Sequence, residues 1–577
     1  MAKRYRPVNR DQPYLFPPSM REWLPPGHPV WLVITAVDEH MDTSAFHAGR
    51  KTGGAGAAGY DPDMLVTVLV WAYACQVTSS RRIEQLCHTD VAFRVICGGN
   101  LPDHVTIARF RSDFPDAVAA FFAGVLALCA RLGMGKLGVV ALDGMKIAAN
   151  ASKSANRTEE SLRKLAAETV AAHGETDAAE DDLFGEGRRG DEVPEDAWSP
   201  RQRGQRIAAA LASLAAEREA AAAERAREAE QRARKEAQYL ADAAAGTPRA
   251  GHPPARAAVA LAAMKAERAR AAQQAKIDAW EARAAAARQA GQPVYGPRPC
   301  DPDRYVRVRE AQAQLEAAQA RAAADAARAA DKQDKDRKEP VRNVTDPDAR
   351  LMPVRGGGFI EGYNTQNVTS EDKLIIATGL TQDTTDTGWF EPMLRRAEDA
   401  AAFITARRPP ATPGGPQPAP APAPAAGRRD EVSASPIGLF LADAGYLSEH
   451  NLTIPGPDRL IATGKTRDLE HAARDPGEPA GMPWQNEAIA AMAARLATPE
   501  GIAAYRHRGH IAETPHGQIK HNMRFRQLSM RGKPKAAAEW TFTAAVHNLF
   551  KAITTGHLTQ ATLAALPSHA HPQAGPA

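Results

Sequence analysis

The sequence predicts a mixed α/β domain that is preceded by an all-α domain and interrupted by a long helical insertion. Three features lead to this prediction. Apolar, strand-like runs occur at residues 138–142 and 438–442, a segment rich in Ala, Arg and Glu separates them, and helix signals fill the chain before the first run. A short apolar run between turn residues is typical of a buried strand, whereas an alanine-rich charged segment is typical of long helices.

Residues 1–136 are predicted to form the all-α domain. Ser79 to Glu84 reads as a capped helix start, and a turn at residues 100–104 leads into a short basic helix from Val105. This outline of helix, turn and basic helix resembles a helix-turn-helix, in which arginines contact DNA phosphates or bases. The alternative is that these arginines only solvate a helical bundle. The candidate DNA contacts are Arg81, Arg82, Arg109 and Arg111.

The insertion spans residues 157–340 and is predicted to be a helical or coiled-coil arm. Alanines and leucines lie in helical rows between charged residues in this segment. Such alanine-rich seams bury little apolar area, so we expect a helical hairpin that serves as a spacer or an interaction arm. A plain solvated helix is the alternative. No catalytic group of residues is expected within it.

Sheet-like patterning resumes behind the insertion. The expected elements are strands at 358–367, 374–380, 438–442 and 458–465, a helix at 389–405, a Pro/Ala-rich loop at 408–430 and a short helix from Ser448. With residues 137–156 as the first strand segment, the order becomes strand, strand, strand, helix, strand, helix, strand, helix. This is the layout of an RNase H-like domain, a mixed sheet with flanking helices whose first and fourth strands are neighbours. The domain would continue over residues 341–555, and residues 556–577 would be a disordered tail.

An aspartate follows each of the two apolar runs, Asp143 after the first strand and Asp443 after the fourth. Neighbouring strands lie about 4.8 Å apart, so both carboxylates would face each other where these strands end. Two such charges repel unless a proton or a cation lies between them. Oxygen ligands of this kind suit Mg²⁺. Neither run is followed by a glycine-rich phosphate loop, which argues against a nucleotide-binding sheet.

A metal site of this type requires a third carboxylate, for which there are two candidates. Glu513 precedes Lys520 by seven residues, so the two would share a helix face about two turns apart. The glutamate would bind metal and the lysine a phosphate. Glu539 has no basic partner at that spacing, and a structural cap or ion pair would explain it. Glu513 is therefore the preferred third acid.

The C-terminal region has the composition of a nucleic-acid surface. Residues 505–551 contain nine Arg or Lys against two Glu, with aromatic residues between them. Such a surface gains affinity by displacing counterions from nucleic acid, although a charged run can also be only solvated. The candidate DNA contacts here and beside Asp143 are Lys520, Arg508, Lys146, Arg524 and Arg526. The histidines at 507, 510, 516 and 521 do not share one helix face, so they are interpreted as phosphate contacts or surface residues.

Seven motifs occur along the chain in a fixed order. They are Arg21-Glu22-Trp23-Leu24-Pro25, Ser79-Ser80-Arg81-Arg82-Ile83-Glu84, Pro102-Asp103-His104, Ala141-Leu142-Asp143-Gly144, Phe359-Ile360-Glu361-Gly362-Tyr363-Asn364-Thr365-Gln366, Ala442-Asp443-Ala444-Gly445-Tyr446 and Gly517-Gln518-Ile519-Lys520-His521-Asn522. As a set they resemble the bacterial insertion-sequence DDE transposases, in particular the IS-eleven-eighty-two branch. The resemblance covers nearly the whole chain. It implies an RNase H-like catalytic domain with an Asp, Asp, Glu metal triad and an N-terminal helical domain.

The resemblance also implies roles for single residues. Asp143, Asp443 and Glu513 match the triad, Lys520 matches the lysine paired with the glutamate, and the family's preceding tyrosine and arginine resemble Tyr505 and Arg508. Two Mg²⁺ ions per site, or Mn²⁺ in their place, would support strand cleavage and transfer. The partners would be double-stranded DNA, as inverted repeats and as target, and further copies of the chain in a homodimer or larger assembly.

The chain departs from the family pattern at two places. Met145 stands where the family usually has threonine in D-G-T-K, and Thr514-Pro515-His516 stands where it has P-V-F in V-E-P-V-F-G. The loss of that phenylalanine is expected to loosen the packing that aims Glu513. Two other functions therefore stay open: a transposase-derived DNA-binding protein without catalysis, and an RNase H-like host nuclease.

Composition bounds the location of the protein. No apolar run approaches the roughly 20 residues that span a bilayer, and no apolar stretch follows the basic N-terminus, so neither a membrane partner nor a signal peptide is expected. Five cysteines without a CxxC pair fit a reducing cytoplasm. Buried structural cysteine is preferred over a zinc site at Cys87-His88. The expected place is the bacterial cytoplasm, in association with the nucleoid.

Overall fold

The computed structural model describes residues 8–10, 19–48, 59–168, 200–244, 255–335, 340–354, 356–409, 435–464 and 486–568. The chain divides into two compact units. The first unit comprises residues 1–157, 168–210 and 342–577, and the second comprises residues 158–167 and 211–341. The insertion therefore interrupts the first unit in sequence, and the segments before and after it fold together in that unit. Of the predicted Pro/Ala-rich loop, residues 410–430 lie outside the described residues.

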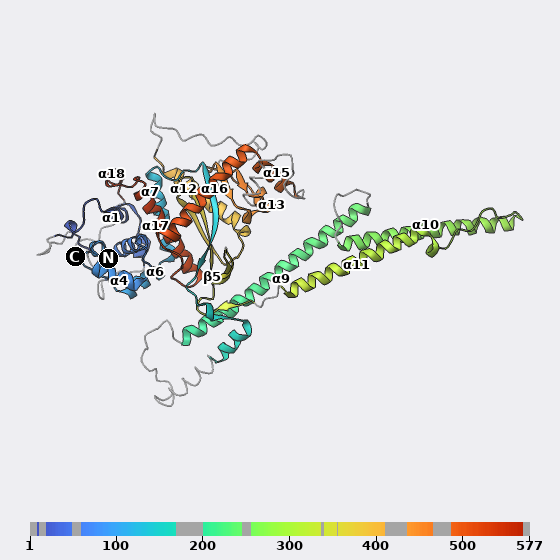
Figure 1. The fold of residues 1–577 in the computed structure, drawn as a ribbon, viewed down its shortest axis with the longest axis horizontal. Coiled ribbons are helices and arrows are strands. Elements are labelled where there is room, and N and C mark those ends of the chain that lie inside the picture. The colour runs from blue at the N-terminus through green and yellow to red at the C-terminus, as the bar shows by residue number, and fades with distance from the viewer. Residues whose placement is uncertain are drawn as a thin grey trace, which may run out of the picture. The chain divides into compact units, whose positions relative to one another are not determined.

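A mixed sheet forms the centre of the first unit (Figure 1). Its strands are β1 (Val139–Ala148), β4 (Arg350–Pro353), β5 (Phe359–Ser370), β6 (Ile375–Thr381), β7 (Leu439–Ala442) and β8 (Arg459–Ile461). The strand order is β4-β5-β1-β7-β8, with β6 also paired to β5. β1 is antiparallel to β5 and parallel to β7, and β7 is parallel to β8. The predicted pairing of the first and fourth strands is thus confirmed.

The predicted order of elements is also confirmed behind the insertion. β5 and β6 are followed by α12 (Phe390–Arg407), β7 by α13 (Glu449–Thr453), and β8 by α15 (Glu487–Leu496) and α16 (Pro499–Gly517). Three short strands were not predicted, namely β4 and the two-stranded pair of β2 (Asn156–Arg157) with β3 (Arg342–Asn343). This small pair joins the two ends of the insertion, because β2 lies at its start and β3 directly follows its end.

Both faces of the sheet are covered, because successive side chains of a strand point to opposite sides. On one face, Ala141 and Leu441 pack in a core with residues of α15 and α16. On the other face, Val140 and Leu142 join a larger core with α12 and α17 (Lys533–Thr554). The strands therefore read as continuous apolar runs, as expected for a sheet that is buried on both sides.

The helices ahead of β1 share that larger core. They are α1 (Pro29–His40), α2 (Ser44–His47), α3 (Pro62–Ala74), α4 (Ser80–Thr89), α5 (Val91–Cys97), α6 (His104–Asp113) and α7 (Pro115–Arg131). α7 packs along α17, and α4 packs against both α5 and α6. Cys87, on α4, is fully buried in this core, as predicted.

Among the described residues, no single helix is long and apolar enough to cross a membrane. The pair α6 and α7 meets the length and composition criteria only when both are taken together, and it bends by 80° at their junction.

The second unit consists mainly of long helices. α9 (Pro200–Ala244) enters it from residue 211, and α10 (Ala255–Gln289) and α11 (Val306–Lys335) pack against each other (Figure 1). Small apolar residues, such as Ala266 and Ala311, are buried between these helices. The α10–α11 pair is the predicted helical hairpin.

The end of the chain differs in part from the predicted tail at 556–577. α18 (Gln560–Ala564) lies in this segment, and Leu558 and Leu563 are buried in the core of the first unit. Leu558 lies just before α18 and Leu563 within it, and two leucines in so short a segment are too weak a signal to stand out from the polar residues around them. Residues 569–577 lie outside the described residues.

Candidate active site

The two predicted aspartates meet where β7 ends. Val139 to Ala141 pair in register with Leu439 to Leu441, so Asp143 and Asp443 stand at equivalent positions of neighbouring strands. One expectation was wrong: Asp143 does not end its strand. β1 continues to Ala148 because β5 pairs with it along its whole length. Among the described strands, β7 pairs with β1 only at Val139 to Ala141, so both aspartates lie just beyond the last pair of that ladder.

A single guanidinium nitrogen lies between the two carboxylates. Arg508 Nη2, from α16, is 2.9 Å from Asp143 Oδ1 and 3.5 Å from Asp443 Oδ2. The Arg508 side chain is only 13% exposed and the Asp143 side chain 14%, so this pairing is largely shielded from water. One cationic group thus neutralises two like charges, which would otherwise repel each other.

The pKa values of the two acids move in opposite directions. Burial raises the pKa of the Asp143 carboxyl, but hydrogen bonding to His516 and the charges of His516 and Arg508 outweigh it, so the pKa lies below its usual range. For Asp443, burial is the largest effect and the charge of Asp143 adds to it, so its pKa is raised despite Arg508. Asp143 is therefore the more firmly ionised member of the pair.

His516 supports Asp143 from the other side. Its Nδ1 lies 3.5 Å from Asp143 Oδ2, and its Nε2 lies 3.0 Å from Asn367 Nδ2. The indole N–H of Trp540 donates to Asn367 Oδ1 at 3.0 Å. Because an indole can only donate, Oδ1 of Asn367 accepts and its amide nitrogen donates to His516. Nε2 of His516 therefore accepts this hydrogen bond, and Nδ1 carries the proton that faces Asp143.

This arrangement corrects two expectations. His516 is 8% exposed and binds Asp143, so it is neither a surface residue nor a phosphate contact. His516 stands where the family has phenylalanine, and because it is buried, the packing at this position is kept. A signal was present in the sequence: Tyr505, Arg508, Ala512 and His516 follow helical spacing and share one face. The spacing of the histidines relative to one another does not reveal this face. His507, His510 and His521 are exposed, as expected.

The structure does not bring Glu513 into contact with the aspartates. Its side chain is exposed on α16, although its charge acts on Arg508. Within the described residues, the group of three or more His, Cys, Asp or Glu with ligand atoms all within 4.8 Å of one another is His47, Asp61 and Asp63, in the N-terminal helices. Glu513 would thus have to turn inward to complete a site at Asp143 and Asp443.

Glu539, the other candidate for the third acid, has a structural position. It is 1% exposed and accepts hydrogen bonds from Tyr73 O–H at 2.9 Å, Ser529 N–H at 2.8 Å and Met530 N–H at 3.0 Å. The Ser529 hydroxyl also donates to it. This carboxylate joins α3 to the loop before α17. The preference for Glu513 over Glu539 is consistent with that geometry.

The candidate DNA contacts fall into two groups. Arg81, Arg82, Arg109, Arg524 and Arg526 are exposed, and Lys520 is half-buried in a turn of π-helix at Gln518–Asn522. Three others are engaged within the fold, and Arg508, which pairs with Asp143 and Asp443, is one of them. Arg111 donates to Thr78 O at 2.5 Å and to Ser80 Oγ at 3.3 Å, so it joins α6 to the start of α4. Lys146 Nζ lies 3.7 Å from Asp386 Oδ1.

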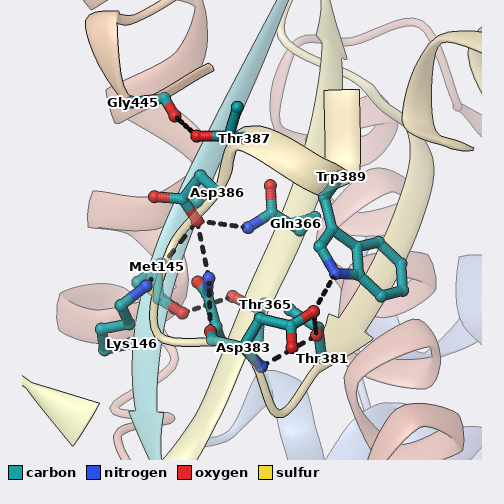
Figure 2. A network of polar contacts seen from close by, with 12 residues as sticks. Met145, Lys146, Thr365, Gln366, Thr381, Asp383, Asp386, Thr387, Trp389 and Gly445 are labelled. Atoms are coloured by element: carbon teal, nitrogen blue, oxygen red, sulfur yellow. Dashed lines mark hydrogen bonds and ion pairs between the residues drawn. The ribbon is translucent and has the colours of Figure 1, made fainter. Parts of the chain in front are cut away.

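Asp386 was not singled out from the sequence, although it lies beside both aspartates. Its Oδ1 accepts hydrogen bonds from Asn364 and Gln366 of β5, and Figure 2 shows the Gln366 amide pointing at this oxygen. Asp386 belongs to a turn between β6 and α12, where no periodicity marks it. The two amides belong to a motif that carried the family resemblance without an assigned role.

The chemistry of the donors fits a divalent cation. Carboxylates from neighbouring strands converge on one positively charged nitrogen, which stands where a cation would be attracted. Hard oxygen ligands are those that Mg²⁺ and Mn²⁺ accept. Asp143 and Asp443 meet this requirement as they lie, whereas Glu513 meets it only after a side-chain movement.

Comparisons with known proteins find two family matches. Residues 18–113 match a family described as a transposase domain, and residues 480–553 match one described as a transposase DDE domain. The second match includes Arg508, Glu513 and Lys520, whereas Asp143 and Asp443 lie outside both. No curated protein and no solved structure matches the chain. Both matches point to the same class of protein: one in the N-terminal part of the chain and one in the C-terminal part, they match a DDE transposase with two domains.

Proposed function

We propose that this chain binds the terminal inverted repeats of an insertion sequence and catalyses metal-dependent strand cleavage and strand transfer in an RNase H-like domain. One observation carries the proposal: Asp143 and Asp443, on neighbouring parallel strands, converge on a single cationic nitrogen. Acids so placed attract a cation, and phosphoryl transfer on DNA is the chemistry that such cations serve.

Asp143 and Asp443 would hold the ions, and Glu513 would join them from α16. Two Mg²⁺ ions, or Mn²⁺ in their place, would supply Lewis-acid stabilisation of the phosphate and a more acidic attacking water or hydroxyl. The other residues act on the protein side. Arg508 keeps the two carboxylates together against their repulsion, and His516 fixes the orientation of Asp143 through its Nδ1 proton.

DNA would be held by the exposed basic residues. Lys520, Arg524 and Arg526 follow α16 directly and would position the phosphates near the acids. Arg81, Arg82 and Arg109, on α4 and α6, would contact the repeats. Binding of this kind releases counterions, so its affinity falls with salt. The α10–α11 hairpin would serve as an arm for contacts between copies of the chain on DNA.

A second candidate is a DNA-binding protein without catalysis, derived from such a transposase. The exposure of Glu513 favours it, because a site that never receives its third acid would not cut. The host-nuclease alternative differs in having no preference for repeats and no joining step.

The experiment uses the purified chain, Mg²⁺ and a labelled duplex that carries the DNA flanking its reading frame. The proposed function predicts nicking at a repeat end and joining of the new 3′-hydroxyl to target DNA. Asp143→Asn and Glu513→Gln should each lose cleavage, whereas Asp383→Asn, a charge change in the β6–α12 turn, should not. Tight binding without nicking would contradict the enzyme and favour the second candidate. Cutting without repeat preference or joining would favour the nuclease.

A further inference from the structure

A glycine follows each of the two aspartates, Gly144 directly after Asp143 and Gly445 two residues after Asp443, and both lie close to the carboxylate of Asp386. A Cβ on Gly144 would lie 2.7 Å from Asp386 Oδ1, and a Cβ on Gly445 would lie 3.0 Å from Asp443 Oδ1 and 3.5 Å from Asp386 Oδ2. Neither glycine has a positive φ, so backbone freedom does not explain them. The carboxylate of Asp386 occupies the space that a side chain at Gly144 would fill, and it reaches to van der Waals contact with the space beside Gly445.

The orientation of Asp386 is determined by the donors on one of its oxygens. Asn364 Nδ2 and Gln366 Nε2 donate to Oδ1 at 2.6 and 2.7 Å, and Lys146 Nζ lies 3.7 Å from the same atom (Figure 2). Tyr446 O–H donates to the side-chain oxygen Oε1 of Gln366, which turns the Gln366 amide nitrogen toward Asp386. Within the described part of the chain these contacts all fall on Oδ1. Oδ2 is left on the side of Gly445 and Asp443.

The turn that carries Asp386 is attached to the turn that carries Asp443. Thr387 Oγ1 donates to Gly445 O at 2.8 Å, and Asn451 Nδ2 donates to Thr387 O at 2.9 Å. These bonds keep Asp386 and Asp443 side by side in spite of their like charges. Such repulsion is tolerated when a cation compensates for it.

The charges around this point leave an excess of carboxylates. Asp143, Asp443 and Asp386 face the cations Arg508 and Lys146, and the charge of Asp386 adds to that of Asp143 in acting on Asp443. Lys146 approaches Oδ1 alone. The side of Asp386 that faces Asp443 has no cationic side chain of its own among the described contacts.

We propose that Asp386 is a further acidic residue of this site, and that its Oδ2 supplies an oxygen donor to the cation held by Asp443. The inference rests on the proposed function, because it requires that cation. It also gives Gly144 a physical reason, since a side chain there would displace the Asp386 carboxylate, and a side chain at Gly445 would crowd Asp443 Oδ1.

The test measures Mn²⁺ binding to the metal-free full chain, without DNA, by titration calorimetry. Asp386→Asn keeps an acceptor for Asn364 and Gln366 but removes the charge, and we expect Mn²⁺ affinity to fall about tenfold. Asp383→Asn is the matched control. It makes the same charge change in the same turn, but its side chain contacts Thr381 and Trp389 instead. This control should bind Mn²⁺ as the wild type does.

A double variant separates a donor role from charge balance. If Asp386 only neutralises Lys146, then Asp386→Asn with Lys146→Gln restores wild-type affinity and overturns the inference. If Oδ2 is a donor, the double variant still binds weakly. Equal affinities of Asp386→Asn and Asp383→Asn would also overturn it.

The Asp443→Asn variant shows whether a negative result concerns the role of Asp386 alone or the metal site that the proposed function requires. Wild-type Mn²⁺ binding by Asp443→Asn would contradict the metal site itself. Loss of binding in Asp443→Asn together with full binding in Asp386→Asn would contradict only the role of Asp386.

Discussion

The roles of the two candidate glutamates can be separated by their effects on folding. Glu539 is buried and accepts hydrogen bonds from the Tyr73 hydroxyl, from the backbone and hydroxyl of Ser529, and from the Met530 backbone. Glu539→Ala removes the acceptor for all of them. Glu539→Gln keeps a carbonyl oxygen for the two backbone N–H groups, and its amide can donate to the two hydroxyls after they rotate.

The expected magnitudes follow from these contacts. A buried donor without a partner costs about 1–3 kcal/mol. A cavity of about 20 Å³ already lies beside Glu539 and Tyr73, which is roughly room for one water, so water can satisfy part of the loss. We expect Glu539→Ala to lower the unfolding free energy by about 4–6 kcal/mol and Glu539→Gln by about 1 kcal/mol.

The assay is urea denaturation of the metal-free protein, followed by the fluorescence of buried tryptophans such as Trp540. Glu513→Gln is the control: because Glu513 is exposed, its replacement should change the unfolding free energy by less than about 0.5 kcal/mol. A loss below about 1 kcal/mol for Glu539→Ala would refute this reasoning. Loss of DNA cleavage by a well-folded Glu539→Gln, with cleavage retained by Glu513→Gln, would make Glu539 the third acid.

Three further predictions concern the surroundings of the site. His516→Phe should fold but cleave DNA at a rate about tenfold lower than the wild type, because loss of a side chain that orients a metal ligand typically lowers activity by about this factor. His516→Asn keeps a hydrogen-bond donor toward Asp143 and should recover most of the rate. Arg109→Ala should reduce by about one the slope of the logarithm of the DNA-binding constant against the logarithm of salt concentration. Arg111→Ala should instead lower the melting temperature of the protein, since Arg111 donates a hydrogen bond to the backbone carbonyl of Thr78. Burial lowers the pKa of His547 to about 4, below its value of about 6.5 in an unfolded chain. As the pH falls, the unfolded state therefore takes up a proton first, and the unfolding free energy should drop by about 2 kcal/mol between pH 7 and pH 5. His547→Gln should abolish this drop, and unchanged pH dependence in that variant would contradict the assignment.

The order of the strands was predictable because apolar runs mark strands that are buried on both faces. Asp143 and Asp443 stood out for the same reason, as carboxylates that directly follow such runs. The pairing of β1 with β7 then followed from the order of elements, and the register of Ala141 with Leu441 agrees with it.

Other parts of the site could not be read from local patterns. Asp386 lies in a turn without periodicity, and its neighbours Asn364 and Gln366 come from a different strand. The path from Trp540 through Asn367 to His516 joins three elements that are far apart in the sequence. Polar contacts of this kind depend on the tertiary fold, which spacing along one helix or strand does not encode.

Metal binding at Asp143 and Asp443 is tested most directly by locating the bound metal along the chain. Fe²⁺ is bound in place of Mg²⁺, and ascorbate with peroxide then generates radicals that cut the backbone near the ion. A metal site at the two aspartates predicts cuts near Asp143 and Asp443, suppressed by excess Mg²⁺ and absent in Asp143→Asn. Cuts at His47 and Asp61–Asp63 instead, where the described residues offer another group of potential ligands, would contradict it.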